Sequence, residues 1–568
     1  MTPKPKLTEL KMDDLTRREF FRRTAFGILP ALALPRLIYA SFPFTSTDIK
    51  VETAFGKLLG SRTEGVNIFK GVPYAGSVSR ERRFLTPAPL KAWTGVREAK
   101  RLGPPSIQGP NQTYGIDEPN PAEDCLTLNI WTPANDNKKR PVMVYSHGGG
   151  YTHGSAGSVA QDGSNLARMY DVVVVATNHR LGLLGYLYLD EIAGDEYAGS
   201  GNRGVQDIAI ALKWVNENIS AFGGDPNNVM IFGESGGGLK TSCLYAMPEA
   251  APYFHKASIE SGPGVMMKTA DVAAETTELL LKQLGIARND WRKLLKLPPS
   301  VLLDAQEQLR KMGDLSQIAG FHGIGAAGKG GFGPVVDGVV LPTHPFDPVA
   351  PSLSKEKPLL VGWNEDEFIF FAMFSGDTEA FQLTEEKLHQ RIESILGDKA
   401  RLVVDTYRKA YPKATPTQLF IAIRSILVMG LGSITIAERK TQQEGALAYL
   451  YNFGYKSDLK VPGTDYEFGS MHAMDIPFKF HNINNVLDKS GHRSSGMAGN
   501  RPERFAASDN MCQLWTSFAR TSVPSAKEQP AWPAYNLSTR PLMRIDTQCS
   551  VINDRYKTVL KMWREILN

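Results

Sequence analysis

Short apolar runs that alternate with a helical pattern constrain the fold of this chain more than any other feature. The runs are rich in Val and Ile and nearly continuous, as expected of strands covered on both faces. Between two of them, apolar residues recur at helical spacing from Val205 to Ile219, and Gly223 to Pro226 ends the helix. Strand, helix and strand in succession favour a parallel sheet with right-handed crossovers. The runs are 142–145, 172–176, 229–232, 359–361 and 448–453.

The rest of the body fits one large α/β unit. The chain has 568 residues, of which 42% are hydrophobic and 22% charged, so collagen-like, low-complexity and disordered classes are excluded. Segments 270–312 and 375–445 are rich in Leu, Lys and Glu and are predicted to be helical insertions. No linker separates independent units, so residues 41–568 are predicted to form a single domain. Its central sheet should be large, mostly parallel and flanked by helices.

The first forty residues have the pattern of an export signal. Arg17 and Arg18 form a twin-arginine pair before Phe20 and Phe21, an apolar run follows from residue 25 to 34, and Ala40 supplies a small residue at the end. A basic head, a short apolar middle and a small exit residue are typical of bacterial secretion. The alternative is a basic amphipathic N-terminal helix. We expect residues 1–40 to engage the export machinery and the protein to be periplasmic or secreted.

The charge distribution bears on possible partners. Eight Lys and Arg against four Asp and Glu fall in residues 1–40, so most of the net charge of +5 belongs to that segment. A body close to neutral provides no electrostatic footprint for nucleic acid. We expect no stretch after residue 40 to be long and apolar enough to cross a membrane. The four cysteines form no CxxC pair, which argues against a cysteine-based metal site.

The most informative motif is Gly-Glu-Ser-Gly-Gly at 233–237, directly after the run 229–232. Glycines on either side of Ser235 allow a sharp turn that exposes its hydroxyl at the end of a strand. We expect a helix from about Leu239, whose first N–H groups would face developing negative charge. The alternative is a structural glycine-rich turn.

A second glycine cluster, Gly148 to Gly150, follows the run 142–145. Consecutive glycines allow backbone N–H groups to point into a site without obstruction by side chains, as an acyl-transfer enzyme needs for its oxyanion. The alternative is a loop of structural glycines.

Together these motifs resemble the type-B carboxylesterase family, a branch of the α/β-hydrolases. The resemblance covers residues 50 to 560 and includes the serine turn and the glycine loop. Further matching stretches are 69–75, 123–130, 178–182, 216–226, 260–262, 334–338 and 532–535. It implies an α/β-hydrolase fold and a reaction without metal or organic cofactor.

The resemblance also assigns roles to single residues. It places the nucleophile at Ser235, the acid at Glu367 and the base at His472. It places the oxyanion donors on the N–H groups of three glycines and puts two polar residues behind the triad. The glycines are Gly149, Gly150 and Gly236, and the polar residues are Ser261 and Asp475.

The residues themselves support this assignment only in part. A serine hydroxyl needs a base, and histidine titrates near neutral pH. Glu367 follows the run 359–361, but Glu365 and Asp366 are equally placed, and only the resemblance chooses among the three. Three positions depart from the family pattern: Gly236 replaces Ala after the nucleophile, Phe368 replaces Gly after the acid, and Asp475 replaces Glu.

The predicted function is a serine carboxylesterase that hydrolyses small-molecule carboxylic esters through an acyl-enzyme. Two alternatives stay open. The first is an amidase or a carbamate or lactone hydrolase with the same triad. The second is a non-catalytic adhesion-type protein on the same fold. Cys125 matches a family disulfide cysteine whose upstream partner is missing here, so the sequence assigns no disulfide.

Overall fold

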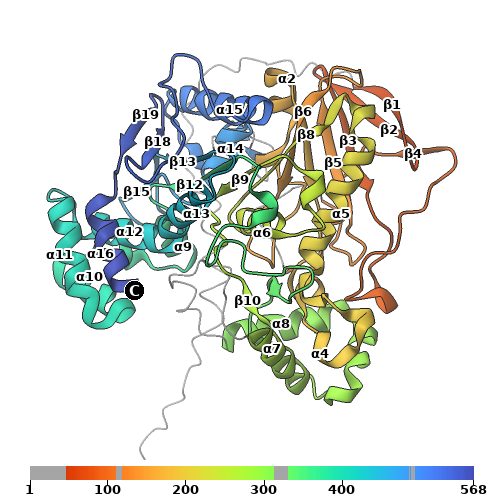
Figure 1. Cartoon of the computed structure of the whole chain (residues 1–568), viewed down its shortest axis with the longest axis horizontal. Helices are drawn as coiled ribbons and strands as arrows, with labels where there is room; N and C mark the ends of the chain where they lie inside the picture. The colour runs from red at the N-terminus through yellow and green to blue at the C-terminus, as the bar shows by residue number, and fades with distance from the viewer. Residues whose placement is uncertain are drawn as a thin grey trace, which may run out of the picture.

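Strands from both ends of the chain meet in one sheet. The computed structural model describes residues 46–109, 118–312, 330–484, 486–487, 493–494 and 496–567, so the predicted export segment 1–40 lies outside the described residues. Within these residues the sheet has thirteen strands (Figure 1). Their order is β1-β2-β3-β5-β7-β6-β8-β9-β12-β13-β18-β19, with β4 paired to β2.

The centre of the sheet is parallel, and its edges are antiparallel except that β4 pairs with β2 in parallel. The parallel strands are β7 (Val173–Thr177), β6 (Arg140–Ser146), β8 (Gly224–Glu234), β9 (Lys256–Glu260), β12 (Leu359–Asn364), β13 (Ala448–Phe453) and β18 (Pro541–Ile545). The outer strands are β1 (Thr47–Thr53), β2 (Gly56–Thr63), β3 (Val66–Pro73), β4 (Val96–Glu98), β5 (Thr127–Thr132) and β19 (Ser550–Asn553). Every residue of β6, β7, β9, β12 and β13 is buried, which explains their continuous apolar sequences.

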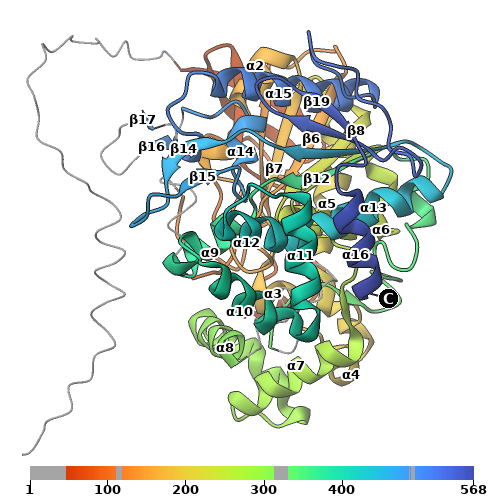
Figure 2. The ribbon, with the colours of Figure 1, turned by 90° about the vertical axis from the view of Figure 1, so that its left-hand side faces the viewer.

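Helices cover both faces of this sheet. In Figure 2, α2 (Ser164–Tyr170) and α15 (Arg504–Thr521) lie above β6 and β8, whereas α5 (Arg203–Asn218), α6 (Gly236–Ala246) and α13 (Leu431–Gln442) lie below. The predicted helix from Val205 to Ile219 is α5. The α/β-hydrolase architecture is therefore confirmed, with the helix α6 between strands β8 and β9.

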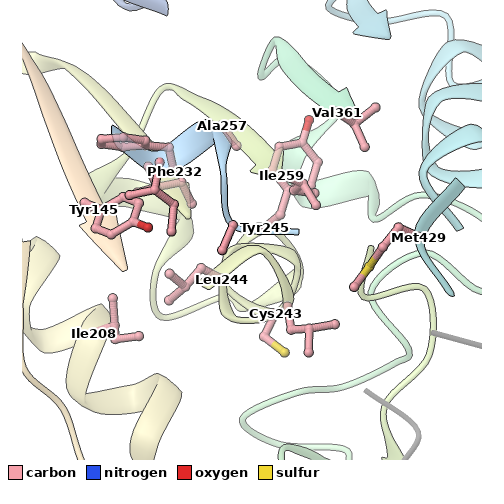
Figure 3. Close-up of a cluster of buried hydrophobic side chains, with 14 of the residues drawn as sticks. Tyr145, Ile208, Phe232, Cys243, Leu244, Tyr245, Ala257, Ile259, Val361 and Met429 are labelled. Carbon is pink, nitrogen blue, oxygen red and sulfur yellow. The ribbon is translucent and has the colours of Figure 1, made fainter. Parts of the chain in front are cut away.

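Helix α6 lies inside the hydrophobic core. Its side chains Leu244 and Tyr245 lie among Ile208 of α5, Ile259 of β9 and Met429 (Figure 3). Burying a large apolar side chain stabilises a fold by about 1.5–3 kcal/mol, so this contact holds α6 firmly against the sheet. Every residue of α6 is buried, including its single charged residue, Lys240.

The predicted helical insertions are also present. Segment 270–312 contains α7 (Ala270–Gln283), a 3₁₀ stretch (Arg288–Lys296) and α8 (Pro299–Met312), which lie at the lower end of the molecule in Figures 1 and 2. Segment 375–445 contains α10 (Glu385–Leu396), α11 (Ala400–Ala410), α12 (Pro416–Ser425) and α13. The shorter elements are α3 (Gly182–Tyr186), α4 (Asp190–Ala193), α9 (Phe368–Phe374), α14 (Asp475–Lys479), α16 (Lys557–Leu567), β10 (Lys268–Thr269), β11 (Val335–Val336), β14 (Ser457–Lys460), β15 (Glu467–Gly469), β16 (Val486–Leu487) and β17 (Arg493–Ser494).

One sequence expectation about the membrane was wrong on length. A π-helical turn (Ile426–Gly430) joins α12 and α13 into one run, Pro416–Gln442, that is long and apolar enough to span a bilayer. Its most apolar window is 78% buried inside the protein, so here the apolar surface packs on other helices and strands. The four cysteines are all buried and free.

Candidate active site

Ser235 occupies a strained turn between β8 and α6. Its φ of 56° and ψ of −121° are unfavourable for a residue with a β-carbon, and its N–H donates to the Glu260 carbonyl of the neighbouring strand at 2.9 Å. Helix α6 begins at Gly236, not near Leu239 as the sequence predicted. The helix therefore starts directly at the serine, and its N-terminal N–H groups lie beside the hydroxyl.

The first turn of α6 consists of three glycines, because backbone segments approach all three positions too closely for a side chain. A β-carbon on Gly236 would collide with the carbonyl oxygen of Gly150, and one on Gly237 would collide with that of Ser146. A β-carbon on Gly238 would lie 2.9 Å from the Glu260 carbonyl oxygen. Glycine in place of the usual alanine at 236 thus has a steric cause.

The imidazole of His472 joins the other two predicted triad residues. Its Nε2 lies 2.8 Å from Ser235 Oγ, and its Nδ1 lies 2.6 Å from Glu367 Oε2. The other carboxylate oxygen of Glu367 accepts the Asn364 N–H at 2.7 Å, which fixes its orientation. All three side chains lie in hydrogen-bonding geometry without any movement.

The two neighbouring carboxylates are engaged elsewhere. Glu365 accepts from Arg544 at 2.7 Å and pairs with Arg555 at 2.7 Å. Asp366 accepts the N–H of Ser470 at 2.8 Å and pairs with Lys456. Of the three carboxylates that the sequence could not separate, the structure places only Glu367 on the imidazole.

The loop that carries His472 is tied to the end of β13. Ser470 Oγ donates to the Phe453 carbonyl at 2.7 Å, and the Asp366 N–H donates to the Ser470 carbonyl at 2.9 Å. The ring of Phe371, on α9, lies 4.9 Å from the imidazole centroid. Because β12 and β13 are adjacent parallel strands, these ties bring the acid and the base to the same sheet edge.

Carboxylates dominate the electrostatics around the imidazole. Glu234, the residue before the nucleophile, is buried, and its Oε1 lies 3.4 Å from His472 Nε2. Burial raises the pKa of Glu234 to about 8. Burial disfavours the imidazolium, but Glu234 and Glu367 outweigh it and raise the pKa of His472 to about 9. The surroundings therefore stabilise a positive charge on the histidine.

Asp475 lies in a buried ion cluster rather than against the imidazole. Lys479, four residues later on α14, pairs with Asp475 Oδ2 at 2.8 Å and with Glu260 Oε2 at 2.5 Å. Asn364 Nδ2 donates to Asp475 Oδ1 at 3.1 Å. The two carboxylates raise the pKa of Lys479 despite its complete burial. The cluster ties the helix after His472 to β9.

Ser261, which the resemblance puts behind the triad, lies in the segment that follows β9 and packs against the Ser235 turn. Its φ is 44° and its N–H donates to the Gly362 carbonyl at 2.9 Å. Within the described part of the chain, its Oγ has no hydrogen-bond partner. A β-carbon on the next residue, Gly262, would collide with the Ser235 carbonyl oxygen, so this segment packs directly under the turn.

The glycine loop presents bare amides next to Ser235. Gly149 and Gly150 have φ values of 86° and 62°, which only glycine adopts at low cost. Among the described residues, neither N–H donates a hydrogen bond within the protein, although the Gly149 carbonyl accepts from His153 at 3.1 Å. Gly236 packs directly against Gly150, so the amides of both segments lie beside Ser235, where donors of this kind suit a negatively charged oxygen.

Sequence reasoning missed Glu234, Lys240 and Lys479. Each is a charged residue inside a segment that is otherwise apolar or fully buried. A charge within an apolar run is visible in the sequence and could have indicated these positions. A buried charge is retained only when it is paired or hydrogen-bonded, so such positions mark special local chemistry.

Comparison with known proteins identifies the family. The model of the carboxylesterase family matches residues 47–563. The para-nitrobenzyl esterase of Bacillus subtilis is 33% identical over 507 residues, which cover 89% of this chain and 96% of that protein. A liver carboxylesterase of Sus scrofa is 31% identical, covering 86% of this chain and 87% of that one. A solved carboxylesterase of Geobacillus stearothermophilus is 36% identical, with a TM-score of 0.76 over 90% of this chain and 99% of its own. The chain therefore belongs to the carboxylesterase family and is a carboxylic ester hydrolase.

Proposed function

We propose that Ser235, His472 and Glu367 are the catalytic residues of this esterase. The observation that carries the proposal is the unbroken hydrogen-bonded chain from hydroxyl to imidazole to carboxylate, at 2.8 and 2.6 Å. Ser235 Oγ attacks the ester carbonyl and gives its proton to Nε2 of His472. Glu367 accepts the Nδ1–H and stabilises the imidazolium.

The negative charge on the tetrahedral intermediate is accepted by the N–H groups of Gly149, Gly150 and Gly236. Each such donor is worth roughly 2.7–4 kcal/mol of barrier when measured by removal. His472 then returns the proton to the departing alkoxide, which leaves as the alcohol. Water attacks the acyl-enzyme by the same route, and the carboxylic acid leaves Ser235 free.

Labelling and mutation test the proposal. We expect the purified protein to hydrolyse short-chain aryl esters and an organophosphate to modify Ser235. Ser235→Ala should lower kcat by about 10⁴–10⁶-fold. Ser242→Ala is the matched control, because Ser242 is a buried serine of α6 whose hydroxyl donates to the Gly238 carbonyl at 3.0 Å. Full turnover by Ser235→Ala would refute the assignment. Paired ester and amide substrates with the same acyl group then define the preferred bond.

We also propose that residues 1–40 direct the protein to the periplasm or the medium. The support is the order of the Arg17-Arg18 pair, the apolar run and Ala40. In a bacterium with twin-arginine export, replacing both arginines by lysine should retain the esterase in the cytoplasm. Unchanged secretion of that variant would contradict the proposal.

A further inference from the structure

Lys240 is buried directly behind the glycine loop. It lies in the second turn of α6, five residues after Ser235, and its side chain has no solvent exposure. Its Nζ donates to the His147 carbonyl at 3.1 Å, and His147 immediately precedes the loop Gly148 to Gly150. The ammonium therefore bonds the backbone from which the oxyanion donors extend.

This bond completes a line of contacts between α6 and the loop. Gly236 packs against Gly150 and Gly237 packs against Ser146, both at distances that exclude a β-carbon. Positions 236, 237 and 240 share one helix face, since residues three and four apart are neighbours. Of these three positions, only Lys240 has a side chain, so only Lys240 can bind the loop backbone through a side-chain hydrogen bond.

Within the ranges that the structure describes, the surroundings of Lys240 provide no counter-charge. In the described residues no carboxylate pairs with it, and the titratable groups facing it are His147, His179 and Cys243. The two imidazoles stack at 4.5 Å, and burial holds the pKa of each well below its usual range. Burial also lowers the pKa of Lys240 to about 7. Burying an unpaired cation lowers the stability of the fold, so we look for a contribution of Lys240 to function that offsets this cost.

Resting on the proposed function, we propose that Lys240 is a positioning residue for ester hydrolysis: its hydrogen bond to the His147 carbonyl holds the amides of Gly149 and Gly150 against the start of α6, where the oxyanion forms. The bond acts on the loop backbone and not on the substrate. A negative charge that develops at these amides also attracts the ammonium, so the transition state gains more from Lys240 than the bound substrate does.

Lys240→Met tests the inference because methionine keeps the length of the side chain and removes the ammonium. The variant leaves the His147 carbonyl without this donor but leaves no charge unpaired in the core, so it should fold. We expect kcat on an aryl ester to fall by about 10–100-fold with KM nearly unchanged, since misplaced donors weaken only the transition state. The affinity for a trifluoromethyl ketone, which forms an oxyanion adduct, should fall by the same factor.

Lys256→Met is the matched control. Lys256 is also buried, its Nζ donates to the Ala519 carbonyl at 2.8 Å, and burial lowers its pKa to about 8, but it lies at the start of β9. We expect the Lys256→Met variant to keep kcat within about twofold of the unmodified protein, although the urea concentration at its unfolding midpoint falls.

Three results can be distinguished. Unchanged kcat and ketone affinity in Lys240→Met overturn this inference while the proposed function stands. Equal losses in both lysine variants, matched to equal losses of stability, also overturn it, because they indicate a general effect of burial. Full activity of Ser235→Ala would instead remove the proposed function on which the inference rests.

Discussion

The two regions on either side of Ser235 are built from different groups. On the histidine side, buried side chains provide the structure and the charge: Glu234, Glu367 and the Asp475–Lys479–Glu260 cluster. On the glycine side, backbone amides do so, and the nearby charged residue is Lys240. Lys479 has two carboxylate partners and a raised pKa, whereas Lys240 has no carboxylate partner among the residues that the structure describes and a lowered pKa.

This difference matches the charges of the reaction. In the proposed mechanism the imidazole becomes positive as the substrate oxygen becomes negative, and the protein places carboxylates near the first and Lys240 behind the second. Both fields are fixed by buried groups, so little reorganisation is needed when the charges appear. The comparison predicts that the histidine side is sensitive to changes of charge and the glycine side to changes of backbone position.

The largest expected effect is from Glu367→Gln. The amide keeps the volume of the side chain but loses the charge that stabilises the imidazolium and fixes its tautomer, so kcat should fall by about 10⁴-fold. Single-turnover acylation of an aryl ester measures this directly. Glu365→Gln is the control, because Glu365 bonds to Arg544 and not to His472. A loss as large in the control would show that the whole segment had shifted.

Next in size is the contrast between the two lysines in stability. Lys479→Met leaves Asp475 and Glu260 buried without their shared cation, so the free energy of unfolding should fall by about 3–5 kcal/mol. Lys240→Met removes a cation with which no carboxylate of the described residues pairs, so it leaves only the His147 carbonyl without a donor and should cost no more than about 1–3 kcal/mol. Urea unfolding of both variants measures the difference. Equal destabilisation of the two variants would contradict this contrast between the lysines, because it would mean that a carboxylate also pairs with Lys240.

Much of this design could be predicted from the sequence. The continuous apolar runs identified strands of the sheet centre, because parallel strands covered on both faces cannot show alternation. The triad was predicted through motifs, and the choice of Glu367 over Glu365 came from the family resemblance. The structure gives a physical reason for that choice: Arg544 and Arg555 neutralise Glu365. Both arginines lie some 180 residues or more from Glu365 in sequence, so only the fold reveals this contact.

Backbone packing was the part that sequence patterns could not provide. Three consecutive glycines after Ser235 indicated a turn before the helix, yet they form the first turn of α6. Glycine is needed there because the glycine loop and β9 approach too closely for any side chain. Helix propensity disfavours glycine, and here tertiary contact overrides it. Lys240 was missed for a similar reason, since the carbonyl that it bonds is 93 residues away.

Gly236→Ala tests the glycine side at its tightest contact. The new methyl group would collide with the Gly150 carbonyl oxygen, so the loop must move away from the helix. We expect kcat to fall by about 10²-fold, a loss comparable to that of one oxyanion donor, with little change in KM. The rate of organophosphate labelling should fall in parallel. Full activity would show that the loop adapts without displacing its amides, and that its backbone position is less critical than the comparison requires.

The smallest effect concerns pH and the histidine side. Glu234 raises the pKa of His472, and the imidazole must be neutral to accept the serine proton. Glu234→Gln removes a negative charge 3.4 Å from Nε2, so the imidazolium becomes less stable and the pKa of His472 falls. The acid limb of the kcat/KM profile should therefore move to lower pH by about one pH unit. Lys240→Met adds no charge near the imidazole and should leave this limb in place. A shift of the limb to higher pH in Glu234→Gln would mean that Glu234 acts on His472 chiefly as a hydrogen-bond partner, and the electrostatic contrast between the two sides would then rest on Glu367 alone.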